Sequence, residues 1–167
     1  MPKVDRLYLD SNVFIHMFEM RDELADHLRE LVLTESTRSE TFLATSDFTL
    51  AELLVEPRRR KDDRLIQIYD NWTVTNDHIT VGPISRDVLR SAAVLRSNYK
   101  SLKLPDAIHL FAAADLRCSH VLTADKSLRE QYDVAHHGFG HPKGPVRLDI
   151  LRPEIDVIRQ LIEEAAR

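Results

Sequence analysis

The chain has 167 residues, of which 43% are hydrophobic and 30% are charged, a composition typical of an ordinary globular protein. This length predicts one domain, residues 1–167, with a core large enough to need no disulfide, and Cys118 is the only cysteine. The formal charge of −4 argues against a protein that coats nucleic acid by electrostatic attraction alone. It is compatible with an enzyme that handles phosphates through a cation held by acidic side chains.

The same features predict the compartment. The first residues contain no basic segment followed by an apolar run, and no apolar run approaches about 18 residues. A single cysteine fits a reducing environment. We therefore expect a cytoplasmic protein that has no membrane-spanning segment.

Short strands alternate with helices along residues 6–133, the expected core. Strands are predicted at 6–9, 41–45, 79–81 and 120–122, and helices at 22–33, 49–55, 63–72, 85–99 and from 105 onward, with a further helical stretch opening at 13–15. This alternation predicts an α/β fold with a mostly parallel sheet of short strands between two layers of helices. Pro57 is expected to interrupt the helix at 49–55, so that the basic run 58–61 lies in a loop.

A different pattern follows the core, over residues 134–167. Three of the four glycines lie at 138–144, together with Pro142, and predict a long loop. Residues 146–151 form a possible edge strand, and Pro153 suits the start of a final amphipathic helix.

Two acidic residues frame the most informative stretch, residues 104–128. Pro105 suits the first position of a helix, and Asp106 places negative charge at the positive end of the helix dipole. The helix is apolar nearly all round and is expected to be buried. Asp125 follows the strand at 120–122. Because ligands of open α/β sheets bind outside the carboxyl ends of the strands, we expect both carboxylates at one rim.

Two further acids occupy comparable positions. Asp10 directly follows the first strand, and Glu52 lies within an apolar helix. Each acid alone fits a structural role: Asp10 and Asp125 as helix caps, Asp106 as a first-turn residue, and Glu52 as a solvated helix residue. Taken together, they fit a shared cleft, because the α/β geometry places both strand ends and both helices at the same rim.

The energetics of such a cluster require a cation. Two carboxylates about 4 Å apart repel each other by roughly 4 kcal/mol at an effective dielectric constant near 20. Four could not all remain ionised in one cleft without a counter-ion, and carboxylate oxygens favour Mg²⁺ or Mn²⁺. A site of this kind polarises a phosphodiester and lowers the pKa of a bound water molecule. The residues therefore favour metal-assisted phosphodiester hydrolysis.

The four acidic segments resemble the ordered motifs of PIN-domain ribonucleases, and most closely those of the toxins of VapBC toxin–antitoxin modules. The segments are Asp10-Ser11-Asn12, Glu52 in Thr-Leu-Ala-Glu-Leu, Asp106 in Leu-Pro-Asp-Ala-Ile-His-Leu-Phe-Ala-Ala-Ala, and Asp125 in Leu-Thr-Ala-Asp. The likeness covers about residues 6–128. It implies a three-layer α/β/α PIN fold, endoribonuclease cleavage of RNA with Mg²⁺ or Mn²⁺, an antitoxin that occludes the site, and frequently a homodimer.

The resemblance also implies roles for individual residues. Asp10, Glu52, Asp106 and Asp125 match the catalytic acids that hold the metal. Asn12 and Thr123 match flanking polar positions, where an amide or a hydroxyl orients a carboxylate or a water molecule.

Other polar residues carry weaker signals. A basic run follows Glu52 within two turns and could grip substrate phosphates, although such a run is also typical of a solvated loop. It consists of Arg58, Arg59, Arg60 and Lys61. His109 lies one turn after Asp106 and is interpreted as a core histidine with satisfied hydrogen bonds, the alternative being assistance in proton transfer.

Two alternative functions stay open. The first is a non-catalytic PIN-fold module that binds RNA or protein. The second is a phosphatase of the haloacid-dehalogenase type with Asp10 as nucleophile, which normally needs a second aspartate two residues later. Asn12 occupies that place and cannot protonate a leaving group, so this alternative is disfavoured.

Overall fold

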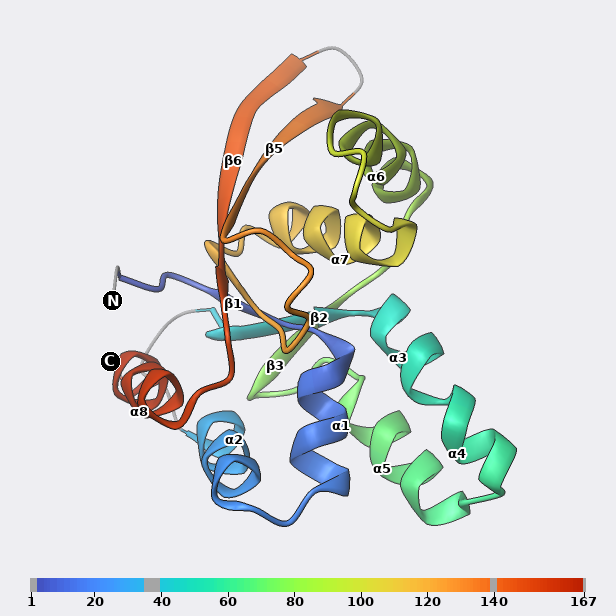
Figure 1. The fold of residues 1–167 in the computed structure, drawn as a ribbon, viewed down its shortest axis with the longest axis vertical. Coiled ribbons are helices and arrows are strands. Elements are labelled where there is room, and N and C mark those ends of the chain that lie inside the picture. Colours follow the sequence, from blue (N-terminus) through green and yellow to red (C-terminus); the bar gives the residue numbers. More distant parts are fainter. Residues whose placement is uncertain (1–2, 35–39, 139–140, 167) are drawn as a thin grey trace.

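A parallel sheet forms the centre of the protein in a computed structural model, which describes residues 3–34, 40–138 and 141–166. The strands follow the order β3-β2-β1-β4-β6-β5, and every neighbouring pair is parallel except β5 with β6 (Figure 1). They are β1 (Leu7–Leu9), β2 (Leu43–Ser46), β3 (Ile79–Gly82), β4 (His120–Leu122), β5 (Gln131–Gly138) and β6 (His141–Leu151).

Helices cover both faces of this sheet. They are α1 (Ser11–Glu19), α2 (Glu23–Leu33), α3 (Asp47–Leu53), α4 (Val55–Arg60), α5 (Asp63–Trp72), α6 (Arg86–Asn98), α7 (Leu104–Asp115) and α8 (Ile155–Ala165). One hydrophobic core contains residues of α6, α7 and the β5–β6 hairpin, and the other contains residues of α1, α2, α5 and α8. The predicted three-layer α/β/α architecture is confirmed. Of the helices described, none is long and apolar enough to cross a membrane.

The central strand β1 shows how side chains are divided between the two cores. Tyr8 points into the α6–α7 core, whereas Leu7 and Leu9 point into the opposite core, as the two-residue period of a strand requires. All three are fully buried. Helix α7 is buried along residues 107–114, as its apolar sequence predicts.

Short polar side chains set the start of several helices. Asp22 accepts a hydrogen bond from the backbone N–H of Ala25, and Ser85 accepts one from Val88. These bonds satisfy backbone donors that the first turn of a helix leaves without partners. The predicted beginnings of the helices near residues 22 and 85 are therefore confirmed.

The prediction that Pro57 interrupts a helix and places the basic run in a loop is wrong. Helix α3 already ends at Leu53, and α4 begins at Val55 with Pro57 in its first turn. A proline is tolerated there because the N–H it lacks would have no helical acceptor. Residues 58–60 are helical, and the helix ends at Arg60, before Lys61, whose φ of 55° is left-handed.

The predicted loop at residues 138–144 is also wrong for the part that the structure describes. Residues 131–138 and 141–151 pair as an antiparallel hairpin, while Gly140 lies outside the described residues. Residue 134 of β5 pairs with 146 of β6, and residue 136 pairs with 143. Strand β6 therefore has one more residue than β5 between these pairs, which is a β-bulge. A bulge relaxes the ladder and accommodates glycine and proline within a strand.

The position of residues 146–151 differs from the prediction as well. They belong to β6, which lies between β4 and β5, so the edge strand on this side is β5. Leu148 is fully buried, consistent with an internal strand. The final helix forms as predicted, although it starts at Ile155, two residues after Pro153.

The single cysteine gives a test of the packing between α7 and β4. Cys118 is buried, and burial raises the pKa of its thiol to about 12, although Arg6 opposes the shift. Since the thiolate is the reactive form, DTNB at pH 8 should label the folded protein at least about 100-fold more slowly than the urea-unfolded protein. Rapid stoichiometric labelling of the folded protein would contradict this packing.

Candidate metal centre

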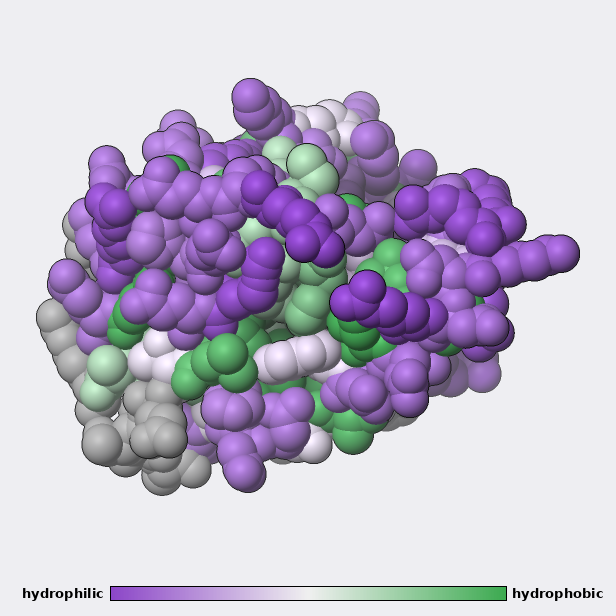
Figure 2. Space-filling model, turned by 90° about the horizontal axis from the view of Figure 1, so that it is seen from below, coloured by the Kyte–Doolittle hydropathy of each residue, from purple (hydrophilic) through white to green (hydrophobic). Residues whose placement is uncertain are grey.

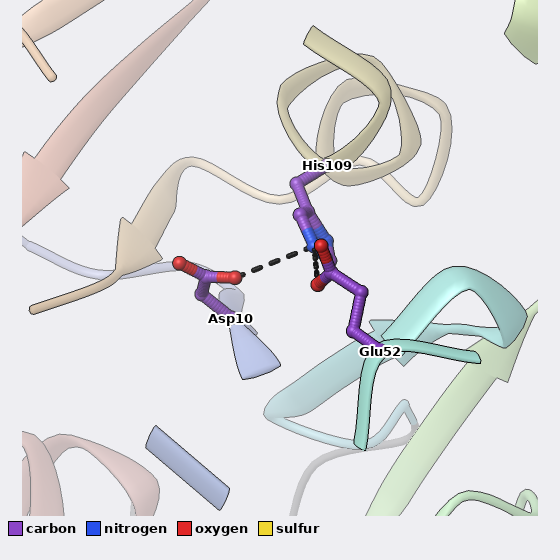
Figure 3. A group of neighbouring side chains, drawn as sticks. All are labelled: Asp10, Glu52 and His109. Atoms are coloured by element: carbon purple, nitrogen blue, oxygen red, sulfur yellow. Dashed lines mark hydrogen bonds and ion pairs between the residues drawn. The ribbon is translucent and has the colours of Figure 1, made fainter. Parts of the chain in front are cut away.

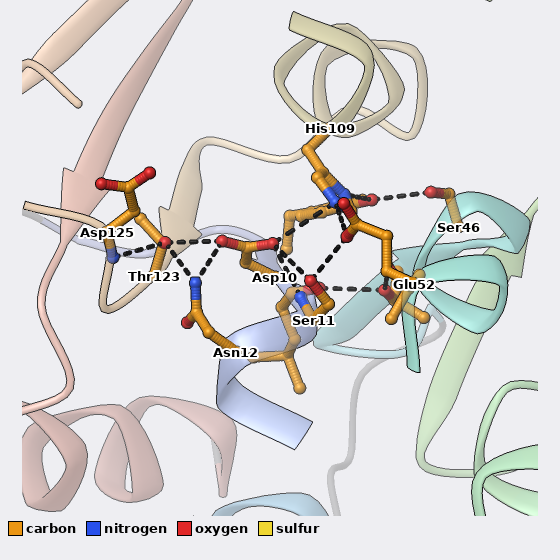
Figure 4. A network of polar contacts seen from close by, with 12 residues as sticks. Asp10, Ser11, Asn12, Ser46, Glu52, His109, Thr123 and Asp125 are labelled. Atoms are coloured by element: carbon orange, nitrogen blue, oxygen red, sulfur yellow. Dashed lines mark hydrogen bonds and ion pairs between the residues drawn. The ribbon is translucent and has the colours of Figure 1, made fainter. Parts of the chain in front are cut away.

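The register of the two central strands brings Asp10 and Thr123 together. Leu9 of β1 is paired with Leu122 of β4, so the residues that follow them leave the sheet side by side. The hydroxyl of Thr123 donates a hydrogen bond to Asp10 Oδ2 at 2.6 Å (Figure 4). The carboxyl end of β1 and β4 is thus a polar rim, as the sequence predicts.

Asp10 combines a structural role with a place in this rim. It caps α1, since its Oδ1 accepts the backbone N–H of Ser11 at 2.7 Å. The Asn12 amide donates to Asp10 Oδ2 at 2.6 Å and to Thr123 Oγ1 at 2.9 Å, while Asn12 Oδ1 accepts the N–H of Ala124 at 2.8 Å. Asn12 and Thr123 therefore hold the Asp10 carboxylate in one orientation.

Glu52 reaches the same place from α3 (Figure 3). Its Oε2 accepts a hydrogen bond from Ser11 Oγ at 2.6 Å and lies 2.7 Å from His109 Nε2. The same His109 nitrogen is 3.4 Å from Asp10 Oδ1. One potential ligand atom from each of Asp10, Glu52 and His109 falls within 4.8 Å of the others, close enough to share one metal ion.

Asp106 and Asp125 extend the negative charge of this cluster. Burial, followed by the neighbouring carboxylates of Asp125 and Asp10, raises the pKa of Asp106. Asp125 lies beyond Thr123 as seen from Asp10 (Figure 4) and donates its backbone N–H to Thr123 Oγ1 at 3.1 Å. Its pKa is lowered, chiefly because its carboxylate accepts the backbone N–H of Ser127. Ser11 and His109 thus link Asp10 to Glu52, whereas Asp106 and Asp125 lie outside this group of possible ligands and are related to it through their charges.

Glu52 has a lowered pKa for a different reason. Burial would raise it, but the hydrogen bonds from His109 and Ser11, and the charge of His109, outweigh that effect. The carboxylate is therefore held in its ionised form, which is the form that binds a cation.

His109 is the member of the cluster that the sequence interpretation underrated. It is 5% exposed and hydrogen-bonded, as expected for a core histidine, but its partners are site residues. Burial opposes its positive charge, yet the Tyr8 hydroxyl, Glu52 and Asp10 together raise its pKa to about 10. The signal in the sequence was its spacing: residues three apart on a helix share a face, and His109 lies three after Asp106.

The basic run lies away from the acids. Arg59 pairs with Glu56 on α4, and Arg60 pairs at 2.9 Å with Glu19 at the far end of α1 from Asp10. Helix α1 has nine residues and is about 13 Å long. This length separates Asp10 from the Arg60–Glu19 ion pair. The structure thus does not bring the basic run into the cluster of acids.

The donor set fits a divalent cation that prefers oxygen ligands. Asp10 and Glu52 supply carboxylates to the cluster, and the pKa of Asp106 nearby is raised first by burial and then by the charges of Asp125 and Asp10. Mg²⁺ and Mn²⁺ favour such ligands. The rim can therefore hold one of these ions at the carboxyl ends of the two central strands.

Sequence comparison defines the class of protein. The model of the PIN domain family matches residues 7–134, which include all four acids. The chain therefore belongs to the PIN domain family. No curated protein sequence matches it.

Solved structures with the same fold include toxin–antitoxin proteins. A chain of a toxin–antitoxin complex from Klebsiella pneumoniae is 21% identical, with a TM-score of 0.56, 89% of this chain covered and 98% of the other. VapC20 of Mycobacterium tuberculosis, described as a sarcin–ricin loop cleaving toxin, is 14% identical, with a TM-score of 0.53 and coverages of 69% and 86%. VapBC2 of Rickettsia felis, bound to a promoter DNA fragment, is 16% identical, with a TM-score of 0.51 and coverages of 71% and 86%.

Charge repulsion in the rim predicts a stabilising substitution. A carboxyl group whose pKa is raised on folding destabilises the fold at pH values above its pKa, so metal-free protein should gain stability as Asp106 is protonated at low pH. Asp106→Asn should therefore raise the melting temperature in EDTA at pH 7. The stability that the metal-free protein gains on acidification should be smaller in this variant. Because the group is half-exposed, we expect at most about 1 kcal/mol, or 2–4 °C.

Asp87→Asn provides the matched control. Asp87 also lies in the first turn of a long helix, α6, but its carboxylate lies 3.6 Å from Arg90 rather than among other acids. Its substitution should leave the melting temperature unchanged or lower it. A lower melting temperature for Asp106→Asn, measured by calorimetry under the same conditions, would contradict the repulsion argument.

Proposed function

We propose that this PIN-domain protein is a metal-dependent endoribonuclease, the toxin of a type II toxin–antitoxin module. The observation that carries the proposal is the cluster of Asp10, Glu52 and His109 beside the carboxyl ends of β1 and β4, to which Asp106 and Asp125 add further negative charge. Similarity to toxin structures supports the toxin assignment, and the description of VapC20 as a sarcin–ricin loop cleaving toxin supports a nuclease activity, for which we propose RNA as the substrate. The site of action would then be the cytoplasm.

In this proposal, each residue of the rim has a defined task. Asp10, Glu52, Asp106 and Asp125 would hold Mg²⁺ or Mn²⁺, which when bound polarises a phosphodiester and lowers the pKa of a water molecule. Asn12 and Thr123 keep Asp10 Oδ2 in place through two hydrogen bonds of 2.6 Å. This fixed arrangement lowers the reorganisation needed when the substrate reacts, which is the main contribution of a rigid site.

Protein partners are part of the proposal. Structures similar to this chain include toxin–antitoxin complexes, and we propose a cognate antitoxin and a homodimer for this protein too. Several large hydrophobic side chains are exposed, among them Ile15, Met20 and Val55, and Figure 2 shows hydrophobic residues at the surface seen from below. Where such side chains form a contiguous patch, exposed apolar surface commonly marks a protein interface. Arg58, Arg59, Arg60 and Lys61 are exposed and remain proposed contacts for RNA phosphates beyond the scissile one.

The test is cleavage of RNA by the purified protein. We expect cutting with Mg²⁺ or Mn²⁺, none in excess EDTA, and recovery when the metal is restored. Asp10→Asn and Asp106→Asn should each lower the rate by at least about 100-fold, because each removes a charged metal ligand. The measurement is the rate of cleavage of total RNA followed by sequencing of the new ends.

Controls separate loss of chemistry from loss of folding. Asp87→Asn should cut at the rate of the unsubstituted protein, and the circular dichroism of all variants should match. Metal-independent RNA binding without cleavage of any RNA would instead favour the non-catalytic binding module. Full activity of Asp10→Asn would contradict the proposed metal centre.

A further inference from the structure

The two oxygens of the Glu52 carboxylate have different surroundings (Figure 4). Oε2 accepts hydrogen bonds from Ser11 Oγ at 2.6 Å and from His109 Nε2 at 2.7 Å, whereas within the described ranges no hydrogen bond reaches Oε1. Glu52 belongs to the seven-residue helix α3, and its side chain is about one-third exposed. Packing alone therefore does not fix this flexible side chain, and the two hydrogen bonds do.

His109 is itself held rigidly. Its Nδ1 is hydrogen-bonded to the Tyr8 hydroxyl at 2.8 Å, and that hydroxyl is 2.7 Å from Ser46 Oγ. The ring packs edge-on against Phe48 and Tyr8, with centroid separations of 5.1 and 5.8 Å. Tyr8, Ser46 and His109 are all buried. The imidazole therefore cannot rotate away from Glu52 without breaking a buried hydrogen bond.

The direction of these bonds follows from the donors available. A carboxylate only accepts, so the proton between His109 and Glu52 lies on Nε2. In the neutral Nε2–H tautomer, Tyr8 donates to Nδ1 and can accept from Ser46. In the imidazolium form, Nδ1 donates to Tyr8 instead. Nε2 donates to Glu52 Oε2 in both forms, so the contact does not depend on the charge of the ring.

We propose that His109 is a positioning residue of the metal centre: its Nε2–H, anchored through Tyr8 and Ser46, holds Glu52 Oε2 and leaves Oε1 as the Glu52 oxygen that a divalent cation binds. This inference rests on the proposed metal-dependent function. It assigns a purpose to the buried Tyr8–Ser46 pair, which lies behind the cluster and cannot reach a substrate. His109 acts through Glu52 and does not bind the cation.

The test is the affinity of the metal-free protein for Mn²⁺, measured by electron paramagnetic resonance of the free ion. His109→Leu should raise the Kd at least about 10-fold, the usual effect of removing a group that orients a metal ligand. His109→Gln should stay within about 3-fold of the unsubstituted protein, because its amide offers an N–H donor at about the distance of Nε2. In RNA cleavage at fixed metal concentration, His109→Leu should lower kcat and leave KM for RNA unchanged.

His120 provides a matched control. It is 2% exposed, as buried as His109, but lies at the start of β4, away from the rim where Thr123 follows that strand. His120→Leu and His120→Gln should alter the melting temperature without changing the Kd for Mn²⁺. Tyr8→Phe is a second variant in case His109→Leu does not fold: it keeps the imidazole, removes its anchor, and should also raise the Kd.

Several results would overturn the inference. An unchanged Kd in His109→Leu and Tyr8→Phe would show that Glu52 needs no positioning, and equally weak binding by His109→Gln and His109→Leu would show that the donor is not what matters. Nitrogen coupling to bound Mn²⁺ in electron spin-echo measurements, lost in His109→Leu, would make His109 a ligand. If Asp10→Asn binds Mn²⁺ as tightly as the unsubstituted protein, the proposed metal centre itself fails.

Discussion

A hydrogen-bond network at the carboxyl ends of β1 and β4 is the feature on which the candidate site depends. Asp10 follows β1, and Asp125 follows the neighbouring strand β4. Glu52 lies on α3, and Asp106 lies on α7. Asp10 also caps α1, whereas the position of Asp106 has an electrostatic cost, since burial and then the charges of Asp125 and Asp10 raise its pKa. Binding of the proposed cation would offset this cost, because a positive ion attracts each of the carboxylates around it.

The surrounding polar residues make that arrangement rigid before any ion binds. Asn12 and Thr123 fix Asp10, Ser11 bridges Asp10 and Glu52, and His109 reaches both acids from behind. The same side chains also serve the fold: Asp10 caps α1, and Asn12 ties that helix to the chain after β4. Site geometry and secondary structure therefore depend on the same hydrogen bonds, which explains how short strands of three or four residues can present a precise site.

Tertiary contacts also determine the structure of the segment that follows the residues matched by the PIN family. The PIN match ends at residue 134, within β5, and the chain continues into the long strand β6. Strand β6 pairs with β4 on one side and β5 on the other, so it completes the parallel sheet and also forms half of a hairpin. Helix α8 then returns to the face of the sheet that α1 and α2 cover, where Ile158 and Leu161 are buried.

Hydrophobic periodicity and turn chemistry in the sequence were sufficient for most of the elements, because a buried helix such as α7 or a cap such as Ser85 is determined by residues close together in the chain. That Asp10 lies beside the residues following β4 was also predictable, since the carboxyl ends of neighbouring parallel strands share a rim. The hydrogen-bond partners of His109 were not predictable, because its spacing from Asp106 suits a buried histidine with any partner. Nor was the hairpin of β5 and β6 predictable, since glycine and proline signal a turn locally, and the pairing with β5 determines that those at the start of β6 lie in a strand.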